Sequence, residues 1–82
     1  ASMGMPFELN TMIVTKGKEQ RIEGNLFQLV KKGYRLYPMH IPLEIRKTLE
    51  SDPSGTAEII KVEWSNDETV LLYNLLSLNS TN

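Results

Sequence analysis

The residues of this 82-residue chain that could do chemistry are few, and its single histidine, His40, comes first. A neutral imidazole can serve as a general base, but it needs a nucleophile or a carboxylate beside it. His40 instead stands between Met39 and Ile41, in a segment bounded by two prolines. This setting is typical of a packed or surface histidine. We therefore predict no catalytic residue and a protein that is not an enzyme.

The sequence also indicates neither a metal site nor a cofactor site. The chain has no cysteine, which excludes thiolate ligands and disulfides. The acidic residues Glu8, Glu19 and Glu23 are scattered and do not have the spacing of metal ligands. The five glycines stand singly, so no glycine-rich loop can surround a phosphate. We expect no metal and no cofactor.

Charge is nearly balanced overall but unevenly distributed along the chain. The net charge is −1. Up to Lys47 there are eight basic and four acidic residues, and from Thr48 onward there are one basic and six acidic residues, so the two parts carry +4 and −5. Such asymmetry is a sign of an interaction surface, although charges of opposite sign could also interleave and cancel in the folded chain.

Basic and aromatic residues alternate in one stretch of the basic part. In strand geometry Arg35 and Tyr37 lie on one face, and we take them with Lys31 and Lys32 as a candidate binding surface. Small β-barrels hold single-stranded nucleic acid in this way, because the cations follow the phosphates and the rings stack on the bases. An ordinary amphipathic hairpin would show the same pattern. Single-stranded nucleic-acid binding is therefore our alternative function.

The segment at residues 70–78 is apolar on both faces if it is a strand. A chain of this length has little material to cover two faces, and an uncovered apolar face marks a partner surface. We take Trp64, Leu71, Tyr73 and Leu75 as candidates for self-association, as in a homodimer. The sequence supports equally well the alternative that this segment is a central strand covered by the other strands. The favoured function is a non-enzymatic module for protein interaction or self-association.

Short strands must position these residues. Segments rich in β-forming residues predict strands over residues 7–15, 21–30, 34–37, 42–48, 56–64 and 69–78. The turn signals between them predict two hairpins. One turns at Lys31-Lys32-Gly33, with Gly33 at positive φ, and the other turns at residues 65–68.

Two of these strands have a helix as an alternative. Asn25 could cap a helix over residues 25–32, and Ser65 and Glu68 have the spacing of a capping box ahead of residues 69–78. We favour strands in both places. The first segment is short and the next one needs a partner, and the second would leave no polar stripe on a helix.

Together these elements predict an all-β fold. A small antiparallel barrel or curled sheet of five to seven short strands, with room for one short helix, fits the spacing of the turns. The length allows one domain, residues 3–82, and Ala1-Ser2 looks like a cloning remnant. No apolar stretch approaches the ~20 residues that cross a bilayer, and no secretory signal is recognisable. We therefore expect no membrane partner and a cytoplasmic location.

Four stretches of the chain carry a resemblance. FELNTMIV, EGNLFQLVKKGYRLYP with the following IPLEI, and the closing SLNSTN are similar to a small family of short, uncharacterised proteins from Gram-positive bacteria, known as a domain of unknown function. The resemblance covers residues 5–82. It implies one domain of bacterial cytoplasmic origin, and it implies no activity, cofactor or catalytic residue.

Overall fold

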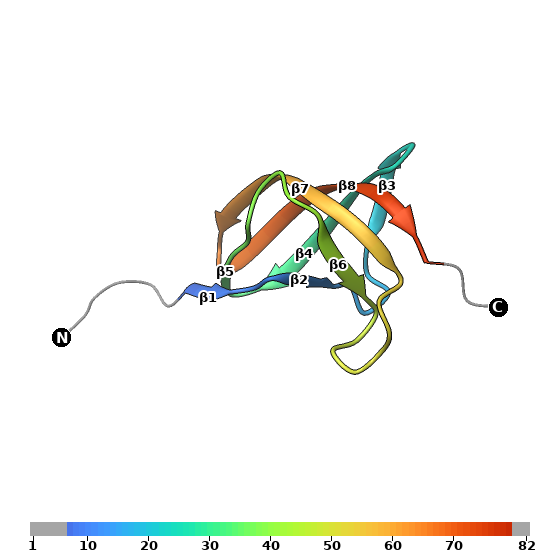
Figure 1. Cartoon of the computed structure of the whole chain (residues 1–82). Coiled ribbons are helices and arrows are strands. Elements are labelled where there is room, and N and C mark those ends of the chain that lie inside the picture. The colour runs from blue at the N-terminus through green and yellow to red at the C-terminus, as the bar shows by residue number, and fades with distance from the viewer. Residues whose placement is uncertain (1–6, 80–82) are drawn as a thin grey trace.

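The strands of this chain are short because turn-forming residues interrupt each apolar segment. A computed structural model describes residues 7–79, a range that excludes Ala1 and Ser2. The strands in it are β1 (Phe7–Leu9), β2 (Met12–Val14), β3 (Gln20–Glu23), β4 (Leu26–Lys32), β5 (Tyr34–Leu36), β6 (Leu43–Arg46), β7 (Gly55–Ser65) and β8 (Glu68–Leu78) (Figure 1). The all-β prediction is confirmed, with more strands than the five to seven expected.

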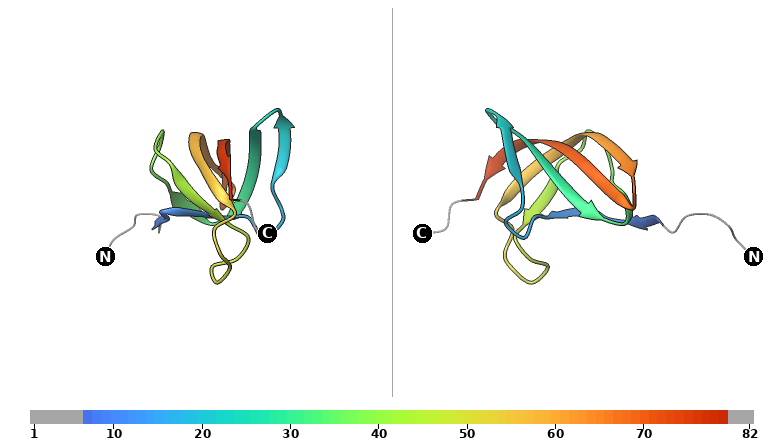
Figure 2. Two further views of the ribbon diagram at one scale, coloured as in Figure 1. Left: turned by 45° about the vertical axis from the view of Figure 1, so that its right-hand side comes forward. Right: turned by 180° about the vertical axis from the view of Figure 1, so that it is seen from behind.

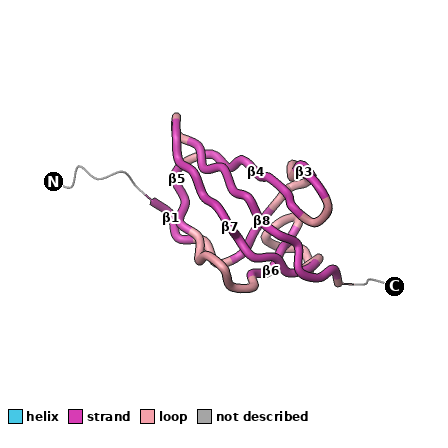
Figure 3. Tube along the Cα trace, turned by 90° about the horizontal axis from the view of Figure 1, so that it is seen from above, coloured by secondary structure: helices cyan, strands magenta, loops and turns pink. Residues whose placement is uncertain are grey.

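No helix forms in the described part of the chain, and Figure 3 shows only strands and loops there. Residues 25–32 and 69–78 both contain strands, so the helical alternatives are excluded. Within residues 7–79 no helix is therefore long and apolar enough to cross a membrane.

Six strands form one sheet in the order β2-β6-β7-β8-β4-β3. β2 pairs with β6 in parallel, and the other neighbours are antiparallel. The sheet curls into a trough that stays open between its edge strands β2 and β3 (Figure 2). β1 and β5 form a separate parallel pair. The predicted curled sheet is thus found, and the closed barrel is not.

The core fills the concave side of this trough. On β8 the side chains of Thr69, Leu71 and Tyr73 are buried, whereas the alternate residues Val70 and Leu72 are only half-buried. The buried apolar residues are Ile13, Leu29, Tyr37, Leu43, Ile45, Ala57, Ile59, Leu71 and Tyr73. The two-residue period of the strands therefore separates an inner face from an outer one.

Irregular pairing along β7 accompanies this curl. The register of β7 with β8 shifts between Thr56 and Ala57 and again between Ile59 and Lys61, and such bulges increase the local twist of a sheet. At the second shift the Ile59 carbonyl accepts a hydrogen bond of 3.0 Å from the backbone N–H of His40. His40 has a φ of 62° and lies in a crossing segment that is not a strand.

The predicted hairpin of β7 and β8 is confirmed. Its turn residues Asn66 and Asp67 both have positive φ, at 52° and 63°, which is the geometry of a type I′ turn that follows the twist of the strands. The turn also contacts the start of β5, because the Asp67 N–H donates to the Tyr34 hydroxyl at 3.1 Å. The tip of the long hairpin is thereby joined to the small sheet.

Two other predicted arrangements are wrong. Residues 7–15 are not one strand, because the chain bends after Leu9 and places β1 and β2 in different sheets. The hairpin at Lys31-Lys32-Gly33 does not form, because β5 pairs with β1 instead of β4. Gly33 has the expected positive φ, 81°, but there it directs the chain out of the large sheet.

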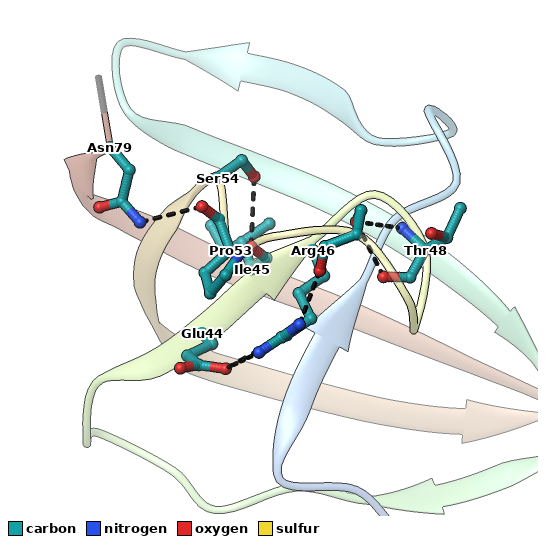
Figure 4. A network of polar contacts seen from close by, with 8 residues as sticks. Glu44, Ile45, Arg46, Thr48, Pro53, Ser54 and Asn79 are labelled. Atoms are coloured by element: carbon teal, nitrogen blue, oxygen red, sulfur yellow. Dashed lines mark hydrogen bonds and ion pairs between the residues drawn. The ribbon is translucent and has the colours of Figure 1, made fainter. Parts of the chain in front are cut away.

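Polar contacts hold the loop after β6 (Figure 4). The Arg46 guanidinium donates to the Ser51 carbonyl at 2.6 Å and to the Glu44 carboxylate at 3.0 Å. At the other end of the loop the Asn79 side chain donates to the Pro53 carbonyl at 2.9 Å. These bonds tie the two ends of the loop to β6 and to the residue that follows β8.

Candidate functional site

Among the strands of residues 7–79, none lies beside half of β4 on one of its two sides. β3 pairs with β4 only as far as Gln28, whereas β8 pairs with β4 along its full length to Lys32. The connection between β2 and β3 faces this uncovered half across a hollow of about 470 Å³. The hollow is lined by Thr15, Lys16, Lys18, Leu29, Val30, Lys31, Lys32, Arg35 and Glu68.

Two smaller hollows adjoin the first, and Arg35 lines all three. One of about 260 Å³ is lined by Glu8, Asn10, Met12, Val14, Lys16, Lys31, Arg35, Tyr37 and Leu49. The other, of about 210 Å³, is lined by Phe7, Glu8, Lys32, Gly33, Tyr34 and Arg35. We call the three together the basic cleft. Its cations are Lys16, Lys18, Lys31, Lys32 and Arg35, and its carboxylates are Glu8 and Glu68.

Lys31 connects the two sides of the trough at this cleft. It stands on β4, and its Nζ donates to the Val14 carbonyl at the end of β2 over 2.9 Å. Burial lowers the pKa of Lys31, and the nearby positive charges of Arg35 and Lys16 lower it further. A cation held beside other cations in a partly buried place is stabilised by an anion. The cleft is therefore suited to a negatively charged ligand.

Arg35 is held in place from several sides. Its Nε donates to the Lys32 carbonyl at 3.0 Å and its Nη1 to the Asn10 side chain at 3.3 Å. The Glu8 carboxylate lies 3.7 Å from Nη1, and the backbone N–H of Arg35 donates to the Thr69 hydroxyl at 2.9 Å. The guanidinium is thus a fixed positive charge at the point where the three hollows meet.

The structure brings Lys31, Lys32 and Arg35 of the predicted binding surface together, but it changes the place of Tyr37. That tyrosine is only 8% exposed and belongs to the core. Burial raises the pKa of its phenol. Tyr37 contributes to the wall of the 260 Å³ hollow, but with so little of it exposed the ring offers no open face on which a base could stack. The predicted exposed pair of Arg35 and Tyr37 is therefore not present.

Two cations of the cleft were not among the predicted site residues. Lys16 and Lys18 lie in the connection between β2 and β3. The uneven charge distribution was the available signal, because both lysines belong to the basic part of the chain. Their position opposite β4 depends on how β2 and β4 meet across the trough, which a local pattern does not specify.

The predicted self-association residues face mainly inward. Leu71 and Tyr73 are 0% and 2% exposed, and Leu75 is partly buried against the core. Trp64 is 44% exposed, and its ring packs against that of Phe7 in a T-shaped arrangement with the centroids 5.7 Å apart. Leu71 and Tyr73 are therefore not available to a partner of the folded chain. On the outer face, the neighbouring strands β4 and β8 carry the apolar residues Leu26, Val30, Val70 and Leu72, which we call the outer strip.

His40 is exposed and lines none of the three hollows. Among residues 7–79 no group of three or more histidine, aspartate or glutamate side chains is placed to hold a metal ion. The chemistry that this part of the chain concentrates in one place is positive charge.

Comparison with known proteins identifies similar chains. A family described as "Domain of unknown function (DUF2584)" matches residues 3–82. The uncharacterized protein YtmB of Bacillus subtilis is 56% identical over 80 residues, which are 98% of this chain and 100% of that protein. The crystal structure of YtmB, a structural genomics target, superposes with a TM-score of 0.92 over 98% of this chain and 99% of that one. The resemblance to a small, uncharacterised Gram-positive family is confirmed.

Proposed function

We propose that this chain, which belongs to the DUF2584 family, is a non-enzymatic binding module whose basic cleft takes an acidic segment of a partner protein. The observation that carries the proposal is the convergence of five cations on one cleft in a chain whose net charge is −1. Complementary charge speeds association and selects partners. An acidic segment is the protein ligand that complements this surface.

The environment of the tyrosines favours a protein over single-stranded nucleic acid. Proteins that bind single-stranded nucleic acid without sequence preference use aromatic rings that stack on the bases, placed beside a basic groove. Tyr37 is buried, and the Tyr34 ring packs against Phe7 with centroids 5.6 Å apart. Phe7 and Tyr34 line the 210 Å³ hollow but pack against each other, so the cleft lacks the predicted pair of Arg35 and Tyr37 on which a base could stack. A cytoplasmic location is part of this proposal, and the absence of cysteine supports it.

Self-association is a second candidate, and the outer strip favours it. Val30 and Val70 are paired across β4 and β8 on this face, and Val30 is exposed. The next cross-strand pair on the same face is formed by the charged residues Lys32 and Glu68. An apolar strip with charges of both signs beside it can complement a second copy of itself about a two-fold axis.

The cleft is tested by removing two lysines whose side chains are exposed. We expect Lys16→Ala combined with Lys18→Ala to weaken binding of a fluorescent eight-residue peptide of alternating glutamate and valine about fivefold, since exposed charge pairs contribute roughly 0.2–1 kcal/mol each. Fluorescence anisotropy at low salt measures the affinity. Lys61→Ala is the control, because Lys61 pairs with Glu63 outside the cleft, and it should leave the affinity unchanged.

Two results would contradict the proposal. Absence of peptide binding at low salt would remove the acidic-segment ligand. Tighter binding of a single-stranded oligonucleotide of equal charge, with a steep loss of affinity as salt rises, would favour the nucleic-acid alternative.

A further inference from the structure

Hydrogen bonds at the two ends of β4 show toward which neighbouring strand the backbone N–H and C=O groups of each residue point. In an antiparallel ladder the N–H and C=O of one residue point to the same neighbouring strand, and successive residues alternate. The Gly33 N–H donates to the Asp67 carbonyl, and the Asn25 carbonyl accepts from the Leu75 N–H. Both bonds lead to the β8 side of β4. The odd-numbered residues of β4 therefore direct their backbone groups toward β8.

The even-numbered residues direct their groups to the other side. Gln28 is paired there with Gln20 of β3, and beyond it no strand of residues 7–79 lies beside β4. The Lys32 carbonyl accepts from Arg35 Nε. Among the described residues, the N–H and C=O of Val30 and the N–H of Lys32 remain without a backbone partner. They lie at the 470 Å³ hollow.

We propose, on the basis of the proposed function, that the acidic segment binds in the basic cleft as an extended strand added to the open edge of β4. Its backbone pairs with Val30 and Lys32, as in other complexes in which a peptide extends a sheet. Its carboxylates lie near Lys16 and Lys18 on the opposite wall of the hollow. The sheet gains one strand in the space that β3 leaves free.

The lysines determine which kind of strand this edge accepts. Lysine on an exposed edge discourages pairing with apolar or basic strands, and proteins use it to avoid aggregation. Here Lys16 and Lys18, from a different segment, also face the same edge. Their charges select a strand rich in glutamate or aspartate. A nucleic acid has no alternating amide and carbonyl groups, so it would use the charges and leave the Val30 amide unpaired.

Amide hydrogen exchange of the unmodified chain tests this mode of binding. In the free protein the amides of Val30 and Lys32 should exchange fast, and those of Leu29 and Lys31 should exchange slowly because they face β8. Saturation with the glutamate–valine peptide should slow exchange at Val30 and Lys32 at least tenfold. The Gln28 amide, already on the β3 side of the ladder, is the internal control and should change little. NMR resolves each amide.

Peptides that carry N-methyl groups give a second measurement without changing the protein. In an extended peptide, every second residue directs its N–H toward β4. N-methylation of these residues should weaken binding at least tenfold, because their N–H groups pair with β4. N-methylation of the residues between them should have little effect. Peptide binding with no protection at Val30, or an equal loss for both sets, overturns the added strand and leaves the acidic-segment function standing. Absence of peptide binding overturns both.

Discussion

Burial gives two tyrosines of the core a common property. Tyr37 and Tyr73 both lose contact with water on folding, and the phenolate form is disfavoured where water is excluded. Burial, followed by the negative charge of Glu19, raises the pKa of Tyr73 to about 12. Burial also raises the pKa of Tyr37. These residues therefore link the stability of the fold to alkaline pH.

The pH dependence has a definite sign. The pKa of Tyr73 is higher in the folded chain than the value of about 10 in the unfolded chain, so its contribution is complete below pH 10 and is lost as pH rises toward 12. We expect the free energy of unfolding to fall over this range, and to fall less steeply in Tyr73→Phe, in which Tyr37 still contributes. Urea denaturation at pH 8 and pH 11 measures this. Equal losses in both proteins would contradict the assignment.

At the level of elements, the β7–β8 hairpin depends on a turn that requires two residues at positive φ. Asn66 and Asp67 adopt this conformation, which costs a residue with a side chain more than it costs glycine. The backbone of Asp67 also binds the Tyr34 hydroxyl, and that contact does not need the carboxylate.

Replacement of one turn residue tests this cost. We expect Asp67→Gly to stabilise the chain by about 0.5–1 kcal/mol, because Asn-Gly is the preferred type I′ sequence. Asp67→Val should destabilise it, since a β-branched side chain is poorly accommodated at positive φ. Thermal unfolding followed by circular dichroism compares the two variants with the parent. A lower melting temperature for Asp67→Gly would show that the aspartate side chain supports the turn in another way.

At the level of the whole molecule, the curled sheet has two faces with different functions in our proposals. The concave face contains the core, and the basic cleft lies where β4 is left uncovered. The convex face carries the outer strip. In these proposals the acidic segment binds at one edge of the sheet and a second copy binds on its outer face.

Sedimentation tests the second of these contacts. We expect the chain to form dimers at about 100 µM, and Leu72→Lys to shift it to monomer because a charge in the outer strip opposes apolar contact. Leu9→Lys is the matched control, since Leu9 is an exposed apolar residue on β1, which belongs to the small sheet and not to the outer face of the large one. Circular dichroism establishes that both variants fold. Monomeric behaviour of the parent chain at this concentration would remove self-association.

The predictable part of the structure was local. Turn residues between β-forming segments predict the strands and the hairpin of β7 and β8, and Gly33 takes the positive φ expected for it. The same patterns do not specify which strand pairs with which. The separation of β1 from β2, and the pairing of β5 with β1, depend on contacts between distant segments.

For the candidate site too, local features could be predicted from the sequence and contacts between distant segments could not. The sequence by itself determined an all-β chain with a basic first part, and it placed Lys31, Lys32 and Arg35 close together along the chain. Only the tertiary structure decided that Lys16 and Lys18 face them and that Tyr37 is buried. The physical reason is that charge and alternation are local properties. The partner and inward face of a strand are instead set by the total burial of the whole sheet.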